Sequence, residues 1–268
     1  MKVTLVLNLL VVLTLTNGLL ALLLFNKYTS TVSFVEAPSI SEFKRSKMVV
    51  PSTPLAPKVM PISVLLNAPV IKQYPELLDG CEVTSLAMLL QYLGLNKSKI
   101  DLAYEMPKDS SPLQYDNGKI LSWGDPNVGF VGEVTGKTRG FGIYHAGLLP
   151  LLKSYVPEAI DLTGRSFDEL ELQLAAGYPV IVWSTIDFTI PDTWVTWESP
   201  SGSIRTTFAE HTVLLVGYDE TKVYINNPAT GKKNEAIDKD QFIETWKVMG
   251  QQALSYRNKG YQIMVNSN

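Results

Sequence analysis

The sequence predicts an α+β fold, in which helices form the first part of one domain and an antiparallel sheet forms the second. Two observations predict this class. Segments with helical periodicity dominate the chain up to residue 177, and segments typical of strands dominate it afterwards. This segregation argues against alternating βαβ units and for separate helical and sheet layers. With 268 residues, of which 46% are hydrophobic, the chain can bury a sizeable core.

The first predicted helix spans residues 79–94 and reads DGCEVTSLAMLLQYLG. From Leu86 onward, leucines recur at i, i+3, i+4 and i+7, so one face of the helix is expected to be buried. Asp79 is the candidate N-cap, and Gly94 is the candidate C-terminal stop. These boundaries place Cys81 in the first turn of the helix.

Three further helices are predicted. One spans residues 146–155 and is bent by Pro150, one spans residues 166–177, and one spans residues 238–249. Ser166 and Glu169 have the spacing of a capping box. Residues 107–142 are rich in Gly, Pro, Asp and Ser and indicate a long irregular loop. Strands are predicted at 179–185, at 193–208 as a hairpin turning at 200–202, and at 211–219, 222–228 and 260–266.

The chain begins with a hydrophobic segment. Residues 3–25 carry no charge, and as a helix they could span roughly 30 Å of hydrocarbon. The segment is longer than a typical signal-peptide core and lacks a clear cleavage site after it, which favours an uncleaved anchor over a cleaved signal peptide. Five prolines then mark an extended tether. The predicted organisation is residues 1–27 as the transmembrane anchor or signal segment, 28–67 as the tether and 68–268 as the globular domain.

Composition excludes several classes of function. The net charge is −3 and there is no stripe of Lys and Arg, so a nucleic-acid partner is not expected. One cysteine cannot form an internal disulfide. With only two histidines and no metal-binding spacing, we expect neither a metal nor an organic cofactor. The segment GEVTGKT does not fit a phosphate-binding loop, because the required glycine is absent and no apolar strand precedes it.

Cys81 is the candidate nucleophile. Unpaired N–H groups at a helix N-terminus lower the pKa of a thiol and so favour the reactive thiolate. On position alone, however, a lone cysteine on an amphipathic helix is more often a small buried hydrophobe.

His211 and Asn227 are candidate partners of Cys81. His211 opens a predicted strand, and Asn227 follows the next strand, where it could accept the imidazole N–H and fix its tautomer. Taken singly, each has a structural alternative: a half-buried histidine, or an asparagine in a simple turn. His211 lies 130 residues after Cys81, and Asn227 lies 16 residues further on. This is the order and approximate spacing of papain-like enzymes.

Two other polar residues have weaker claims. Gln73 lies eight residues before Cys81, where a side-chain amide could help to stabilise an oxyanion, although a surface position is the simpler interpretation. His145 is an alternative base, but a structural role fits it better. The aromatic segment FTIPDTWVTW could line a substrate groove or, more simply, pack within the hairpin.

The motifs QYPELLDGCEVTSLAMLLQYLG, GDPNVGFVGEVTG, EHTVLLVGYD and VYINNPATGKK together resemble the bacterial cysteine-peptidase family thirty-nine-like proteins. These are papain-fold relatives of the peptidases that remove double-glycine leaders from bacteriocins. The resemblance covers about residues 60–257. Within the family, the chain looks most like the stand-alone, exported branch found in Gram-positive bacteria. It implies a papain-like fold in which the nucleophile helix packs on the sheet. Leader cleavage itself is not implied, because leader-cleaving relatives carry fused transporter domains.

The resemblance also implies roles for particular residues. Cys81 would be the nucleophile, His211 the general base and Gln73 part of the oxyanion hole. Asn227 takes the third position, where many relatives have Asp. A neutral amide stabilises an imidazolium less than a carboxylate does, so the rate and the pH profile are expected to differ.

The leading hypothesis is therefore a cysteine peptidase that acts on a peptide or protein substrate. We expect a monomer at the cell membrane, with a single-pass anchor and an extracellular catalytic domain, or else a protein secreted after signal cleavage. Two alternatives stay open. One is a non-catalytic peptide-binding module on a papain-like fold, and the other is a cell-wall peptide amidase or transpeptidase.

Overall fold

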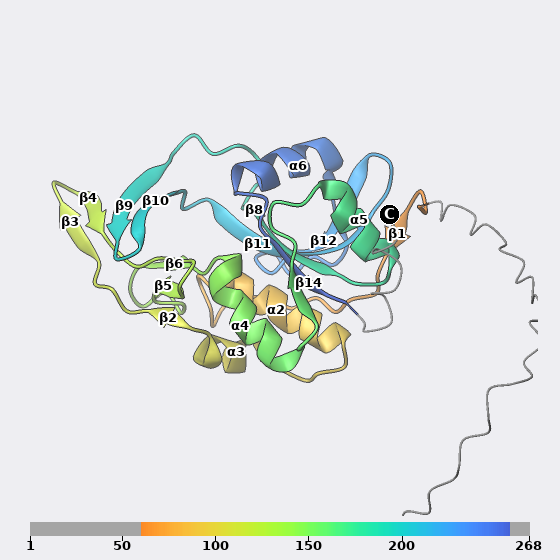
Figure 1. Ribbon diagram of the computed structural model, residues 1–268, viewed down its shortest axis with the longest axis horizontal. Coiled ribbons are helices and arrows are strands. Elements are labelled where there is room, and N and C mark those ends of the chain that lie inside the picture. The colour runs from red at the N-terminus through yellow and green to blue at the C-terminus, as the bar shows by residue number, and fades with distance from the viewer. Residues whose placement is uncertain (1–59, 258–268) are drawn as a thin grey trace, which may run out of the picture. The chain divides into compact units, whose positions relative to one another are not determined.

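The computed structural model describes residues 60–257, and its centre is a seven-stranded sheet (Figure 1). The strand order is β13-β12-β11-β8-β14-β7, with β1 also paired to β11, and every pairing is antiparallel. The strands are β1 Val64–Leu65, β7 Ala159–Asp161, β8 Val180–Thr185, β11 Glu210–Tyr218, β12 Lys222–Asn226, β13 Glu235–Asp238 and β14 Ala253–Tyr256.

Helices cover both faces of this sheet (Figure 1). On β8, Ile181 and Trp183 join the core beneath one set of helices, whereas Val180 and Val182 join the core beneath the other. This alternation is the period-two pattern of a strand buried on both faces. The first set is α2 Cys81–Tyr92, α3 Lys99–Glu105 and α4 His145–Tyr155, and the second is α5 Phe167–Ala175 and α6 Lys239–Val248. The predicted α+β class, with the nucleophile helix packed on an antiparallel sheet, is confirmed.

The predicted helices form, together with α3, which the sequence patterns did not indicate, but the predicted Asp79 cap and the predicted capping box are wrong. Gly80 is the N-cap of α2, and the backbone N–H of Asp79 instead donates to Val134 O. Ser166 is the N-cap of α5, but its side chain makes no capping hydrogen bond, so the predicted capping box does not form. Gly94 follows the end of α2 with φ +80°, a left-handed conformation that favours glycine.

Residues 107–142 are not the irregular loop that their composition indicates. They contribute to two small sheets, one with the order β2-β5-β6 and one with the order β10-β9-β4-β3. Buried Trp123, Val131, Phe141 and Trp197 form a separate hydrophobic cluster among them. The strands are β2 Lys108–Asp109, β3 Gln114–Asp116, β4 Lys119–Ser122, β5 Phe130–Gly132, β6 Gly140–Gly142, β9 Val195–Ser199 and β10 Gly202–Thr206.

Some predicted segments fall at or beyond the ends of the described residues. Within residues 60–257, no helix has the length and hydrophobicity that a membrane span requires. The predicted anchor at 1–27 and the predicted strand at 260–266 lie outside these residues. Strand β1 belongs to the segment predicted as a tether, yet it pairs with β11. The final strand that the structure describes is β14, which the sequence patterns did not indicate.

Candidate active site

The fold brings the N-terminus of α2 to the beginning of β11. Cys81 is the first residue of α2, and Glu210 is the first residue of β11. The hydroxyl of Ser85, one helical turn after Cys81, donates to Thr212 O at 3.2 Å and ties the helix to the strand. The sequence therefore predicted correctly that Cys81 and the His211 segment lie on packed elements.

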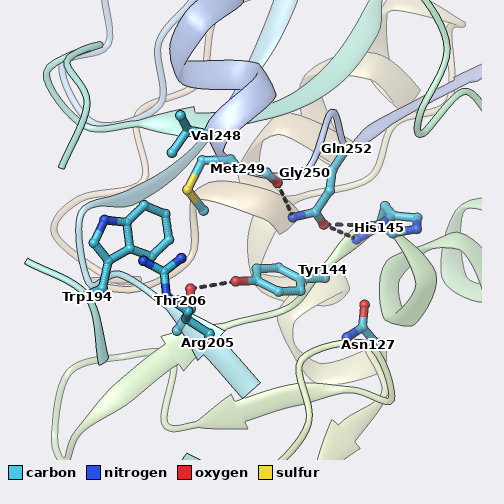
Figure 2. A pocket seen from close by; sticks show the side chains of 10 residues that line it. All are labelled: Asn127, Tyr144, His145, Trp194, Arg205, Thr206, Val248, Met249, Gly250 and Gln252. Atoms are coloured by element: carbon cyan, nitrogen blue, oxygen red, sulfur yellow. Dashed lines mark hydrogen bonds between the residues drawn. The ribbon is translucent and has the colours of Figure 1, made fainter. Parts of the chain in front are cut away.

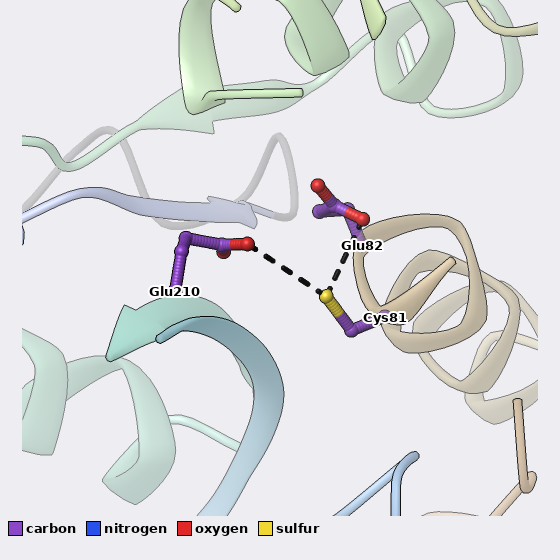
Figure 3. A group of neighbouring side chains, drawn as sticks. All are labelled: Cys81, Glu82 and Glu210. Carbon is purple, nitrogen blue, oxygen red and sulfur yellow. Dashed lines mark hydrogen bonds between the residues drawn. The ribbon is translucent and has the colours of Figure 1, made fainter. Parts of the chain in front are cut away.

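Two carboxyl groups flank the sulfur of Cys81 (Figure 3). Sγ lies 3.4 Å from Glu82 Oε2 and 4.0 Å from Glu210 Oε2. Glu82 is completely buried, and its other oxygen accepts the Ile143 N–H at 2.7 Å. Glu210 Oε1 accepts the hydroxyl of Thr212 at 2.9 Å. Neither carboxyl was singled out from the sequence.

This environment keeps Cys81 protonated. Burial, the neighbouring Glu82 and Glu210 and the hydrogen bond to Glu82 raise the pKa of the thiol, while the backbone N–H of Thr212 opposes them. The net direction is the reverse of that expected from the helix N-terminus alone. Burial also raises the pKa of Glu82, to about 7, and that of Glu210. The raised pKa values favour the protonated form of all three groups.

Cys81, Glu82 and Glu210 also form the one group among residues 60–257 whose ligand atoms lie close enough, within 4.8 Å, to hold a metal ion. The carboxyl groups and the thiol satisfy one another by hydrogen bonding when protonated, so the geometry alone does not assign an ion to them.

His211, Asn227 and Glu235 form a hydrogen-bonded chain. His211 Nε2 lies 3.0 Å from Asn227 Oδ1, and Asn227 Nδ2 donates to Glu235 Oε2 at 2.8 Å. Oδ1 also accepts the Ala229 N–H at 3.0 Å, which identifies it as the oxygen of the amide. An amide oxygen carries no hydrogen and cannot donate a hydrogen bond, so Nε2 of His211 must carry the imidazole hydrogen. In the neutral ring, the lone pair is then on Nδ1.

The His211 ring is neutral at physiological pH. It is buried, and burial lowers its pKa to about 4, against the smaller opposing effects of Asn227 and Glu235. A neutral ring with a free Nδ1 lone pair can accept a proton. Within the described residues, however, the sulfur of Cys81 makes its hydrogen bonds to the carboxyls and not to this ring.

Gln73 is not the surface residue that spacing alone favours. It is 4% exposed, and its Nε2 donates to Leu78 O at 2.8 Å. Its Oε1 is buried and has no hydrogen-bond partner among the described residues. One amide hydrogen remains beyond the bond to Leu78.

His145 lies in a different environment from Cys81. Its Nδ1 lies 3.0 Å from Gln252 Oε1, and its Nε2 lies 3.5 Å from Asp161 Oδ2. With Gln252 it lines a cavity of about 270 Å³, shown in Figure 2. Trp194 lines the same cavity. The guanidinium carbon of Arg205 lies 4.2 Å from the centre of the Trp194 ring. In the aromatic segment, Trp194 thus faces a hollow, whereas Trp197 packs in the separate cluster.

One feature of the sequence could have pointed to Glu82 and Glu210, namely a charged residue beside a run of buried residues. Glu82 lies inside an unbroken buried run from Cys81 to Leu90, and Glu210 opens a strand in which every following residue is buried. A charged residue in a buried run needs a partner or a function. Glu235 gave no comparable signal, because it begins a strand that is alternately exposed.

Comparisons with known proteins identify relatives of this chain. Residues 65–254 match the model of the peptidase C39-like family. The uncharacterized protein YvpB of Bacillus subtilis is 43% identical over 181 residues, which cover 67% of this chain and 70% of YvpB. The crystal structure of a candidate C39-like peptidase from Bacillus anthracis is 40% identical, with a TM-score of 0.67, and the match covers 74% of this chain and 98% of that one. Xylellain, a cysteine protease from Xylella fastidiosa, is 17% identical, with a TM-score of 0.40 over 74% of this chain and 87% of its own.

Proposed function

Because the chain belongs to the peptidase C39-like family, we propose that it is a cysteine peptidase with Cys81 as nucleophile, His211 as general base and Asn227 as the residue that orients the base. The observation that carries this proposal is the fixed tautomer of His211. Asn227 holds the hydrogen on Nε2 and leaves Nδ1 as the proton acceptor, which is the state that a general base requires.

The reaction begins when the thiol of Cys81 exchanges its hydrogen bond to Glu82 for one to His211 Nδ1. The thiol proton passes to Nδ1 while Sγ bonds to the carbonyl carbon of the substrate. The tetrahedral oxyanion collapses, the C–N bond breaks, and the imidazolium gives its proton to the leaving amine. Water, deprotonated by Nδ1, then cleaves the thioester and releases the acid and the free thiol.

Gln73 supports the oxyanion in this proposal. Its bond to Leu78 O uses one Nε2 hydrogen and fixes the side chain, and the second hydrogen joins the Cys81 backbone N–H as donor to the oxyanion. The start of α2 contributes in the same direction, because its first N–H groups have no partner within the helix.

A peptidyl vinyl sulfone tests the proposal on the full chain. We expect a covalent adduct on Cys81 that forms faster than the adduct of free cysteine at pH 7, together with cleavage of a peptide library. Cys81→Ser should abolish both. If Cys81 reacts no faster than free cysteine, the enzyme reading is wrong and the fold serves as a peptide-binding module. Release of peptide from purified peptidoglycan, without cleavage of the library, would instead identify a cell-wall amidase.

We also propose that residues 1–27 hold the domain at the outer face of the membrane. The support is the uncharged run of residues 3–25 and the Pro-rich segment that follows it. Fractionation of cells that express the full chain tests this. Membrane association that is lost when residues 1–27 are deleted supports an anchor, and a shortened chain in the medium shows a cleaved signal peptide instead.

A further inference from the structure

Asn227 is held from both sides of its amide. Oδ1 accepts two N–H groups, from His211 and from the Ala229 backbone, and Nδ2 donates to Glu235. A reversed amide would turn its NH₂ group toward two donors and its oxygen toward a carboxylate. Asn227 is 2% exposed, so water could not replace the lost bonds. The orientation of this amide therefore depends on Glu235 as well as on the turn.

Glu235 is itself fixed in place. It begins β13 and pairs with Ile225 of β12, the strand that leads to Asn227. Its second oxygen accepts Lys232 Nζ at 3.0 Å, and its side chain is 17% exposed. The carboxylate is thus anchored at both oxygens, one toward Lys232 and one toward Asn227.

We propose that Glu235 is a positioning residue for the triad, and that position 227 is an amide because a carboxylate already occupies the place behind it. The catalytic consequence of this positioning role rests on the proposed function. Asp at position 227 would set two carboxylates at hydrogen-bond distance, where like charges repel. With Asn, the negative charge lies one residue further from the imidazole and still favours the imidazolium that forms during the reaction.

A double-mutant cycle tests this coupling through activity. We expect N227D to lower kcat/KM at least tenfold, with kcat affected more than KM. The N227D/E235Q double variant should recover to within about threefold of the wild type, since Gln can donate to the new carboxylate. E235Q alone should lower kcat a few-fold and shift the acidic limb of the pH profile downward. The proposal is overturned if N227D lowers kcat/KM by the same factor in the wild-type and in the E235Q protein.

A second measurement does not need activity. In ¹⁵N-histidine-labelled protein, the two histidines are distinguished with a His145→Gln variant. We expect wild-type His211 to show a protonated Nε2 that exchanges slowly with water, and Glu235→Ala to speed that exchange at least tenfold. Glu244→Gln, an exposed glutamate on α6, is the matched control and should change neither readout. Unchanged exchange in Glu235→Ala would refute the positioning role, whereas an inactive wild type with the expected exchange would refute only the proposed function.

Discussion

Replacement of Glu82 by Gln should make Cys81 more reactive. In the native protein, Glu82 Oε2 accepts a hydrogen bond from the Cys81 thiol at 3.4 Å, and the charge of Glu82 disfavours the thiolate. Gln keeps the acceptor for the Ile143 N–H, and it places an NH₂ group where Oε2 lies. This group can donate to a thiolate and so stabilises it. Glu82→Gln therefore removes a barrier to ionisation while it preserves the hydrogen bond that holds the side chain.

The size of the effect follows from the separation of the charges. A full charge at 3.4 Å interacts by about 5 kcal/mol at an effective dielectric constant of about 20. Because the pKa of Glu82 is about 7, the carboxyl carries only part of that charge at neutral pH. We therefore expect the pKa of the thiol to fall by about one to two units, at about 1.4 kcal/mol each.

Alkylation by iodoacetamide as a function of pH measures this shift directly. The midpoint of the rate profile should move to lower pH in Glu82→Gln, and the rate at pH 7 should rise about tenfold. Glu244→Gln, which alters an exposed side chain on α6, should leave the profile unchanged. A midpoint that stays in place or rises in Glu82→Gln would refute the view that this carboxyl holds the thiol protonated.

Three further predictions concern stability. Burial lowers the pKa of His211 to about 4, below its ordinary 6.5, so the contribution of this group to the free energy of unfolding should fall by about 3 kcal/mol as the pH drops from 6.5 to 4. The raised pKa values of Glu82 and Glu210 contribute in the opposite direction over this range. His211→Gln should remove this contribution of His211, so that its free energy of unfolding falls less, or rises more, than that of the wild type as the pH drops; an equal change in denaturant titrations would contradict the assignment. Gly142→Ala should lower stability by about 2 kcal/mol or more, because φ is +151° and a Cβ would lie 2.4 Å from Glu82 Oε1; an unchanged Tm would refute it. Trp197→Ala removes a buried side chain that donates to Gly124 O at 2.8 Å, and should cost about 3–5 kcal/mol while leaving Cys81 alkylation intact.

The sequence predicted the parts of the site that depend on local pattern. Cys81 was placed in the first turn of a helix from the leucine periodicity, and the structure begins α2 at that residue. His211 and Asn227 were paired from their spacing and their positions at strand ends, and a 3.0 Å hydrogen bond joins them. Each of these features follows from residues near one another in sequence or from a recurrent order along the chain.

The charges around the sulfur could not be predicted in the same way. Glu210 lies 129 residues from Cys81 in sequence, so its effect on the thiol exists only after α2 has packed on β11. Because burial removes the solvation of all these groups, the net direction of the Cys81 pKa depends on tertiary packing rather than on helix position. The strands within residues 107–142 were missed for another reason, since each has only two to four residues, too few to show a clear alternating pattern.

The two small sheets share the hydrophobic cluster of Trp123, Val131, Phe141 and Trp197, which differs from the two cores that support the main sheet. The four-stranded sheet is built from residues 114–122 and 195–206, whereas Cys81 and Glu210, next to His211, begin α2 and β11. Substitutions in the four-stranded sheet therefore act on a cluster other than the core through which α2 packs on β11, so that they can alter this surface while the positions of Cys81 and His211 are kept.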